Sequence, residues 1–220
     1  FLNELRASVE NYLHALELDP NDARSSANLG AVYLSLDDVD NALKYLERAT
    51  TLDPKSWYAW LNLGLARDAK GNYKEAEAAY RRAQELDSSQ PSVLFNLASN
   101  LVTQGRPDEA IAIFKQLLER EPNNARYHKR YADALVVANR PDDADKEYRE
   151  SLRVDSRYYP AMNELGLLLI TRYKREAELD DDKKKSALDF WRQSLAVNPD
   201  QPRIKALIAE WGPHDQSGKT

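Results

Sequence analysis

The sequence predicts an all-α protein built from stacked pairs of antiparallel helices, and two observations support this prediction. A short motif recurs every 34 residues, and glycine and long β-branched runs are both scarce. A fixed period of roughly 20–50 residues is typical of solenoid arrays, in which each repeat packs on its neighbours. The motifs that close the periods are Leu18-Asp19-Pro20, Leu52-Asp53-Pro54, Leu86-Asp87-Ser88, Arg120-Glu121-Pro122 and Val154-Asp155-Ser156.

Each period contains two predicted helices that pack closely together. With the closing proline numbered 32, positions 4, 7, 8 and 11 form one helical stripe and positions 20, 24 and 27 form another. Small residues at positions 8 and 20 allow close backbone approach, and a bulky residue at position 24 fills the adjacent space. Position 8 holds Gly30, Gly64, Ala98, Ala132 and Gly166, position 20 holds Ala42, Ala76, Ala110, Ala144 and Ala187, and position 24 holds Leu46, Tyr80, Phe114, Tyr148 and Trp191.

Position 15 lies between the two helices and predicts a left-handed turn. It holds Asp37, Gly71, Gly105 and Asn139, which are residue types that tolerate the left-handed conformation at the end of a helix. Proline follows two residues later in two of the repeats, where it can begin the next helix.

This pattern resembles the tetratricopeptide repeat, from about Leu5 to Trp211. The resemblance implies a right-handed α-solenoid, the tetratricopeptide-repeat superhelix, with about 12 helices. The implied organisation is the second helix of a truncated repeat (1–22), five repeats (23–56, 57–90, 91–124, 125–158 and 159–201), a capping helix (202–212) and a disordered tail (213–220). The fifth repeat is nine residues longer than the period, with a charged insertion near 172–185.

A row of asparagines is the main candidate binding feature. Asn28, Asn62 and Asn96 all occupy position 6, which in the family points into the concave groove. An asparagine amide offers one acceptor and two donors, which match the backbone of an extended peptide. A similar ladder occurs in related arrays such as that of O-linked N-acetylglucosamine transferase. The alternative is that these asparagines only bridge or cap neighbouring helices.

Basic and apolar residues extend this candidate site. Arg126 and Arg130, with Asn96, match three places of the carboxylate clamp found in chaperone-binding members of the family, whereas Leu61 and Leu65 replace the other two. The clamp is therefore incomplete, although an acidic ligand group near Arg126, Lys129 and Arg130 fits the charges. A solvated or ion-paired helix face is the alternative. The apolar residues that we expect in the groove include Tyr58 and Phe95.

The chain carries no recognisable catalytic or cofactor signature. It has no cysteine, and His14, His128 and His214 are far apart in the sequence. No metal or other cofactor is expected, since the acidic insertion lacks the ligand spacing of a calcium loop. A net charge of −5 and the absence of a long apolar stretch argue against nucleic acid and membrane insertion.

The sequence therefore predicts a non-catalytic interaction module that binds an extended peptide or a partner helix as a scaffold or adaptor. Two alternatives stay open. The array could recruit substrates for a larger enzyme such as a glycosyltransferase, or it could self-associate through an open N-terminal end formed by residues such as Leu5, Val9 and Tyr12.

Overall fold

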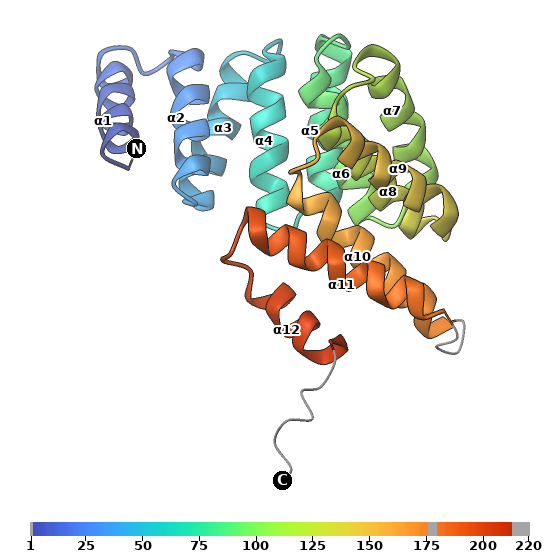
Figure 1. The fold of residues 1–220 in the computed structure, drawn as a ribbon. Helices are drawn as coiled ribbons and strands as arrows, with labels where there is room; N and C mark the ends of the chain where they lie inside the picture. The colour runs from blue at the N-terminus through green and yellow to red at the C-terminus, as the bar shows by residue number, and fades with distance from the viewer. Residues whose placement is uncertain (1, 176–179, 213–220) are drawn as a thin grey trace. The chain divides into compact units, whose positions relative to one another are not determined.

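The computed structural model describes residues 2–175 and 180–212, and these residues form an all-helical chain (Figure 1). The proposed tail at 213–220 and the tip of the insertion lie outside them. The described helices are α1 (Leu2–Leu18), α2 (Ala23–Ser35), α3 (Val39–Leu52), α4 (Trp57–Ala69), α5 (Tyr73–Leu86), α6 (Pro91–Thr103), α7 (Pro107–Arg120), α8 (Ala125–Val137), α9 (Pro141–Val154), α10 (Tyr159–Arg175), α11 (Asp181–Val197) and α12 (Pro202–Trp211). The predicted all-α class is confirmed.

The chain divides into two compact units, Phe1–Ile113 and Phe114–Thr220. In unit 1, α1 to α6 lie side by side in chain order, and α2–α3 and α4–α5 form tight pairs (Figure 1). In unit 2, α8–α9 and α10–α11 form the tight pairs, and α12 packs against α11. Each unit is thus a stack of helices joined by short turns, as nearest-neighbour packing in a repeat array requires.

The small and bulky positions of the repeat meet inside the pairs α4–α5 and α10–α11, as the sequence predicts. A Cβ added to Gly64 would lie 2.6 Å from Cδ1 of Tyr80, and one added to Gly166 would lie 2.7 Å from Cδ1 of Trp191. The side chains of Tyr80 and Trp191 are fully buried. Each aromatic ring therefore occupies the space that a side chain at the glycine position would fill.

The turns inside the repeats adopt the predicted left-handed conformation. The φ angles are 60° at Asp37, 83° at Gly71, 73° at Gly105 and 56° at Asn139. At Gly71 the following residue, Asn72, donates its backbone N–H to the carbonyl of Arg67 at 2.9 Å. This bond satisfies a carbonyl that the end of α4 would otherwise leave without a partner.

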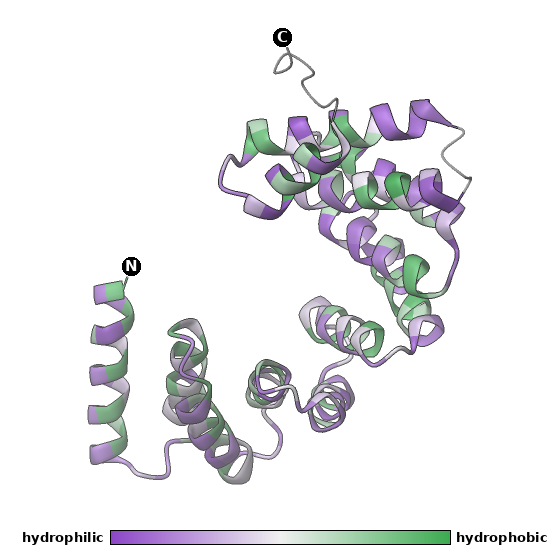
Figure 2. Ribbon diagram, turned by 90° about the horizontal axis from the view of Figure 1, so that it is seen from below, coloured by the Kyte–Doolittle hydropathy of each residue, from purple (hydrophilic) through white to green (hydrophobic). Residues whose placement is uncertain are grey.

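The outer elements differ from the regular repeats. α1 has one hydrophilic and one hydrophobic side, and the hydrophobic side faces α2 (Figure 2). The only buried residue of α1 is Leu16. α10 and α11 are each 17 residues long, whereas α8 has 13 and α9 has 14. None of the helices in the described ranges is both long enough and apolar enough to span a membrane.

Candidate functional site

The three asparagines of the predicted row lie on α2, α4 and α6 of unit 1, each on the first helix of its repeat. Asn62 donates Nδ2–H to the carbonyl of Tyr58 at 2.8 Å, and Asn96 does the same to the carbonyl of Ser92 at 2.8 Å. Each bond reaches back four residues, so the two amides are held in the same way. In the described part of the chain, neither carboxamide oxygen accepts a hydrogen bond.

Burial limits what this row can offer to a ligand. Asn62 is 7% exposed, whereas Asn28 and Asn96 are partly exposed. Tyr58 is 38% exposed and its ring lies edge-on to Trp57, with the centroids 6.0 Å apart. Phe95 is only 4% exposed, so most of its ring packs inside unit 1. The accessible apolar surface beside the row therefore comes mainly from Tyr58.

The predicted basic cluster lies on α8 of unit 2, and a carboxylate occupies much of it. Lys129 Nζ lies 2.8 Å from Oδ2 of Asp133, and Arg130 lies 3.4 Å from the same oxygen. The hydroxyl of Tyr148 donates to Oδ1 of Asp133 at 2.8 Å. Arg126 belongs to the same helix and also has interactions of its own. An acidic ligand would compete with Asp133 for these cations.

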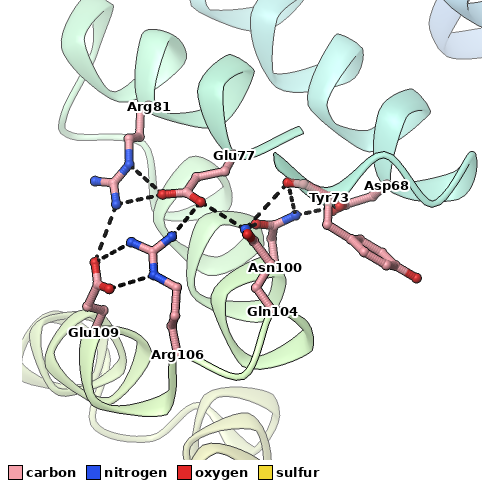
Figure 3. A network of polar contacts seen from close by, with 8 residues as sticks. All are labelled: Asp68, Tyr73, Glu77, Arg81, Asn100, Gln104, Arg106 and Glu109. Atoms are coloured by element: carbon pink, nitrogen blue, oxygen red, sulfur yellow. Dashed lines mark hydrogen bonds and ion pairs between the residues drawn. The ribbon is translucent and has the colours of Figure 1, made fainter. Parts of the chain in front are cut away.

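A polar network inside unit 1 has no counterpart in the sequence prediction (Figure 3). Asn100 is 2% exposed and its Nδ2 donates to Oδ1 of Asp68 at 2.6 Å and to the carbonyl of Tyr73 at 3.0 Å. Gln104 donates to Oδ1 of Asn100 at 2.6 Å, and the Tyr80 hydroxyl donates to Oδ2 of Asp68 at 2.7 Å. The sequence signal that could have revealed it is a polar residue beside the buried stripe of α6.

The network continues into a group of charged side chains (Figure 3). Glu77 accepts from Gln104 at 2.8 Å, from Arg106 at 2.6 Å and from Arg81 at 2.8 Å. Arg106 also pairs with Glu109 at 2.7 Å. Burial raises the pKa of Glu77, but these donors outweigh burial and lower the pKa overall. The group joins α5, the end of α6 and the start of α7, and so it has a structural role.

Burial and hydrogen bonding act in opposite directions on the pKa of Asp68. Desolvation raises the pKa of Asp68, and the hydrogen bonds from Tyr80 and Asn100 oppose this rise without cancelling it. The carboxylate therefore depends on its two donors for much of its solvation. Burial and the neighbouring Asp68 charge raise the pKa of Tyr80 as well, so the Tyr80 hydroxyl stays a donor.

His128 lies between two hydrogen-bond acceptors in unit 2. Its Nδ1 is 2.7 Å from Oε2 of Glu147, and its Nε2 is 2.9 Å from the carbonyl oxygen of Pro122. A neutral imidazole can donate from only one nitrogen, so both contacts are satisfied only by the protonated ring. Burial lowers the pKa of His128, but these bonds and the charges of Glu147 and Glu150 outweigh it and raise the pKa above 6.5.

Comparison with known protein families settles the identity of the repeat. The family described as "Tetratricopeptide repeat protein 21 C-terminal ARM domain" matches residues 3–140, which is more than half of the chain. The chain belongs to this tetratricopeptide-repeat family. No curated protein sequence matches it.

Solved structures of other tetratricopeptide-repeat proteins share the fold. One is YrrB, described as a TPR protein with an unusual peptide-binding site, with TM-score 0.65, 20% identity and coverage of 92% of this chain and 98% of YrrB. A second is a tetratricopeptide repeat protein from Parabacteroides merdae, with TM-score 0.73, 17% identity and coverage of 96% and 78%. A third is Pseudomonas aeruginosa pilF, with TM-score 0.70, 19% identity and coverage of 93% and 91%. These neighbours share the fold, and membership of the tetratricopeptide-repeat family indicates a repeat scaffold for protein interaction.

The tetratricopeptide-repeat chain also has open cavities that are lined by residues other than the asparagines of the row. One of about 490 Å³ in unit 2 is bordered by His128, Tyr131 and Glu147. Another of about 410 Å³ lies at the turn between α4 and α5, near Tyr73. A third of about 360 Å³ lies between α11 and Trp211. Over the described ranges, no group of three or more histidine, aspartate or glutamate side chains is arranged to hold a metal ion.

His128 is expected to make the stability of this tetratricopeptide-repeat chain dependent on pH. Since the folded-state pKa is raised, its contribution is fully present below 6.5 and is lost as the pH rises through the folded-state value. His128→Gln should therefore destabilise the chain more at about pH 5.5 than at about pH 8.5. Urea unfolding at both pH values measures this, and His14→Gln is the control because the His14 side chain is 71% exposed. An equal loss of unfolding free energy at both pH values would contradict the inference that the folded chain holds a protonated His128 ring.

Proposed function

We propose that the chain is a non-catalytic protein-interaction module that binds an extended peptide along the first helices of unit 1. The observation that carries this proposal is the row of Asn28, Asn62 and Asn96. One amide stands at the same position of three successive repeats, all within one compact unit. Interaction is the usual role of this repeat, and YrrB is described as having a peptide-binding site.

The way in which two of the amides are held supports recognition of a peptide backbone. Asn62 and Asn96 each use one N–H on their own helix, through bonds of 2.8 Å. The second N–H and the carboxamide oxygen of each remain for a ligand, and these are the groups that pair with a peptide unit. Because the internal bond fixes the amide, less side-chain entropy is lost when a peptide binds.

Hydrogen bonds alone give only weak binding. Three asparagine contacts at a net ~0.5–1.5 kcal/mol each provide about 1.5–4.5 kcal/mol. An affinity in the millimolar range corresponds to about 4 kcal/mol. Apolar contacts are therefore needed as well, and Tyr58 is the most exposed aromatic beside the row. The ligand would lay its backbone on the amides and an apolar side chain against this ring.

An acidic group on the ligand would use a different part of the chain. Arg126, Lys129 and Arg130 lie on α8 in unit 2, and Asp133 already balances part of their charge. We infer that an acidic group adds affinity only where it displaces Asp133 from Lys129 or Arg130. Such competition costs part of the gain, because Asp133 also holds the hydroxyl of Tyr148.

The test is a triple substitution of the row, Asn28→Ala, Asn62→Ala and Asn96→Ala. Peptides selected from a displayed random library on the unmodified protein serve as probes, and calorimetry measures their affinities. The triple variant should bind at least about tenfold more weakly, as the loss of about 1.5 kcal/mol or more requires. N-methylation of the peptide backbone should have a similar effect, since it removes donors that the amide oxygens accept.

The matched control replaces three exposed asparagines that lie in turns, Asn21, Asn72 and Asn123, by alanine. These changes remove the same chemical groups away from the first helices. Equal affinity of the unmodified protein and the row variant for every selected peptide would refute the proposal. Circular dichroism on both triple variants excludes unfolding as the cause.

A further inference from the structure

The cavity between α11 and α12 in unit 2 has a composition unlike the rest of this acidic chain. It has a volume of about 360 Å³ and is lined by Asp181, Lys184, Lys185, Leu188, Arg192 and Trp211. Its lining carries three cations and one carboxylate, whereas the whole chain has a net charge of −5. The cavity is therefore a local region of positive charge.

Two of these cations have no carboxylate partner among the described residues. In the part of the chain that the structure describes, neither Lys184 nor Lys185 makes an ion pair. Lys184 Nζ lies 6.0 Å from the ring centroid of Tyr173, and Arg192 pairs with Asp189 at 3.1 Å on an exposed face. An exposed pair of this kind contributes little and exchanges readily for another carboxylate.

The apolar wall of the cavity is held in place from α10. The indole of Trp211 meets the ring of Tyr173 edge to face, with the centroids 6.4 Å apart at an interplanar angle of 89°. Lys174 Nζ lies 4.5 Å from the Trp211 ring centroid. Leu188 forms the neighbouring wall and is 6% exposed. A partly exposed indole that is fixed by two contacts is a pre-formed surface for an apolar side chain.

We propose that this cavity is a second docking site, which binds an acidic segment of a partner protein. One carboxylate of the segment would contact Lys184 and Lys185, and an adjacent apolar side chain would pack on Trp211 and Leu188. Lysine and arginine bind carboxylates through charge-assisted hydrogen bonds, and the indole supplies apolar contact area. This site lies on other helices than the asparagine row and does not depend on it.

A peptide fits this cavity better than other polyanions do. Phosphate alone would leave the apolar wall uncovered. A nucleic acid or an anionic membrane would bring a high density of negative charge towards Asp181 and Asp182, which lie on the same helix end. A short acidic segment that contains one apolar residue places its charges only where the cations lie.

The experiment uses fluorescence anisotropy with a dye-labelled peptide in which aspartates flank a single leucine. The unmodified chain should bind this peptide, and a peptide with asparagine in place of each aspartate should bind at least about tenfold more weakly. The double variant Lys184→Glu and Lys185→Glu should show a similar loss. Trp211→Phe should weaken binding less, because phenylalanine keeps part of the apolar surface.

The control is Lys55→Glu with Lys74→Glu, which makes the same change in net charge on exposed residues of unit 1. This control should leave peptide binding unchanged. Equal losses in the two double variants would overturn the proposal, because the attraction would then be a property of overall charge. Failure of the peptide to bind, or its displacement by inorganic phosphate or by phosphatidylserine vesicles at matched charge, would overturn it too.

Discussion

Replacing Gly64 by alanine is expected to lower the free energy of unfolding by about 1–3 kcal/mol, although alanine is the better helix former. The added Cβ would lie 2.6 Å from Cδ1 and 2.9 Å from Cζ of Tyr80, a ring that is fully buried and cannot move aside freely. The hydroxyl of this ring also donates to Asp68 at 2.7 Å, which fixes its position further. Either the helices separate or the hydrogen bond is lost, and both outcomes destabilise unit 1.

Urea unfolding of two further variants separates steric overlap from backbone strain. Gly71→Ala changes a glycine with φ of 83° that has no atom within 4 Å of the added Cβ, so its cost comes only from the left-handed backbone. Combining Gly64→Ala with Tyr80→Leu should cost less than the sum of the two single changes, because the smaller side chain removes the overlap. If Gly64→Ala stabilised the chain, as its helix propensity alone predicts, the close approach of α4 and α5 would be refuted.

Replacing Asn100 by leucine is expected to lower the free energy of unfolding by about 2–4 kcal/mol. The change removes three hydrogen bonds. The amide of Asn100 donates two of them, to Asp68 at 2.6 Å and to the carbonyl of Tyr73 at 3.0 Å, and accepts the third from Gln104 at 2.6 Å. Leucine has a similar volume, so the loss reports the unpaired groups and not a cavity. Because Asp68 is a carboxylate, losing the hydrogen bond to it costs more than losing the hydrogen bond to the Tyr73 carbonyl.

The dependence of this loss on pH identifies Asp68 as the cause. Desolvation already raises the pKa of Asp68 above 3.8, and removal of a donor to its charged form raises it further. A raised pKa means that the ionised carboxyl group is disfavoured in the folded state. The loss of unfolding free energy caused by Asn100→Leu should therefore become smaller as the pH falls from 7 towards 3.8. Asn96→Leu is the control on the same helix, since its amide bonds only to the carbonyl of Ser92. A loss that does not change with pH would contradict this assignment.

The sequence determined the parts of the fold that repeat. Gly64 and Tyr80 stand sixteen positions apart, as the corresponding residues do in every repeat except the fifth, where the insertion lengthens the spacing. This recurring spacing is enough to predict that the two residues meet between two helices. The left-handed turns were equally predictable, because φ angles of 60° at Asp37 and 56° at Asn139 are chosen by residue type within a few residues of chain. Periodic packing and local backbone preference both select similar residue types at the same positions of successive repeats, so the sequence alone reveals them.

Side-chain contacts that occur only once, between residues of different helices, could not be predicted from the repeat. Asn100 reaches Asp68 across 32 positions and Gln104 reaches Glu77 across 27, and neither pairing recurs at equivalent places in the other repeats. The close contact of His128 with Glu147 likewise depends on how α8 and α9 pack. For the asparagine row, the spacing came from the sequence, while the structure showed that Asn62 is 7% exposed and that Phe95 is buried.

The amino-acid pattern alone predicts the helical repeat, its left-handed turns and the pairing of small with bulky residues, since these features depend on interactions within one period. The packing of the helices sets which polar groups are buried together, such as Asp68 with Asn100. It also sets which cations make no ion pair within the described residues, such as Lys184 and Lys185. Burial and hydrogen bonding depend on the distances between side chains from different helices, and the period of the repeat carries no information about these distances.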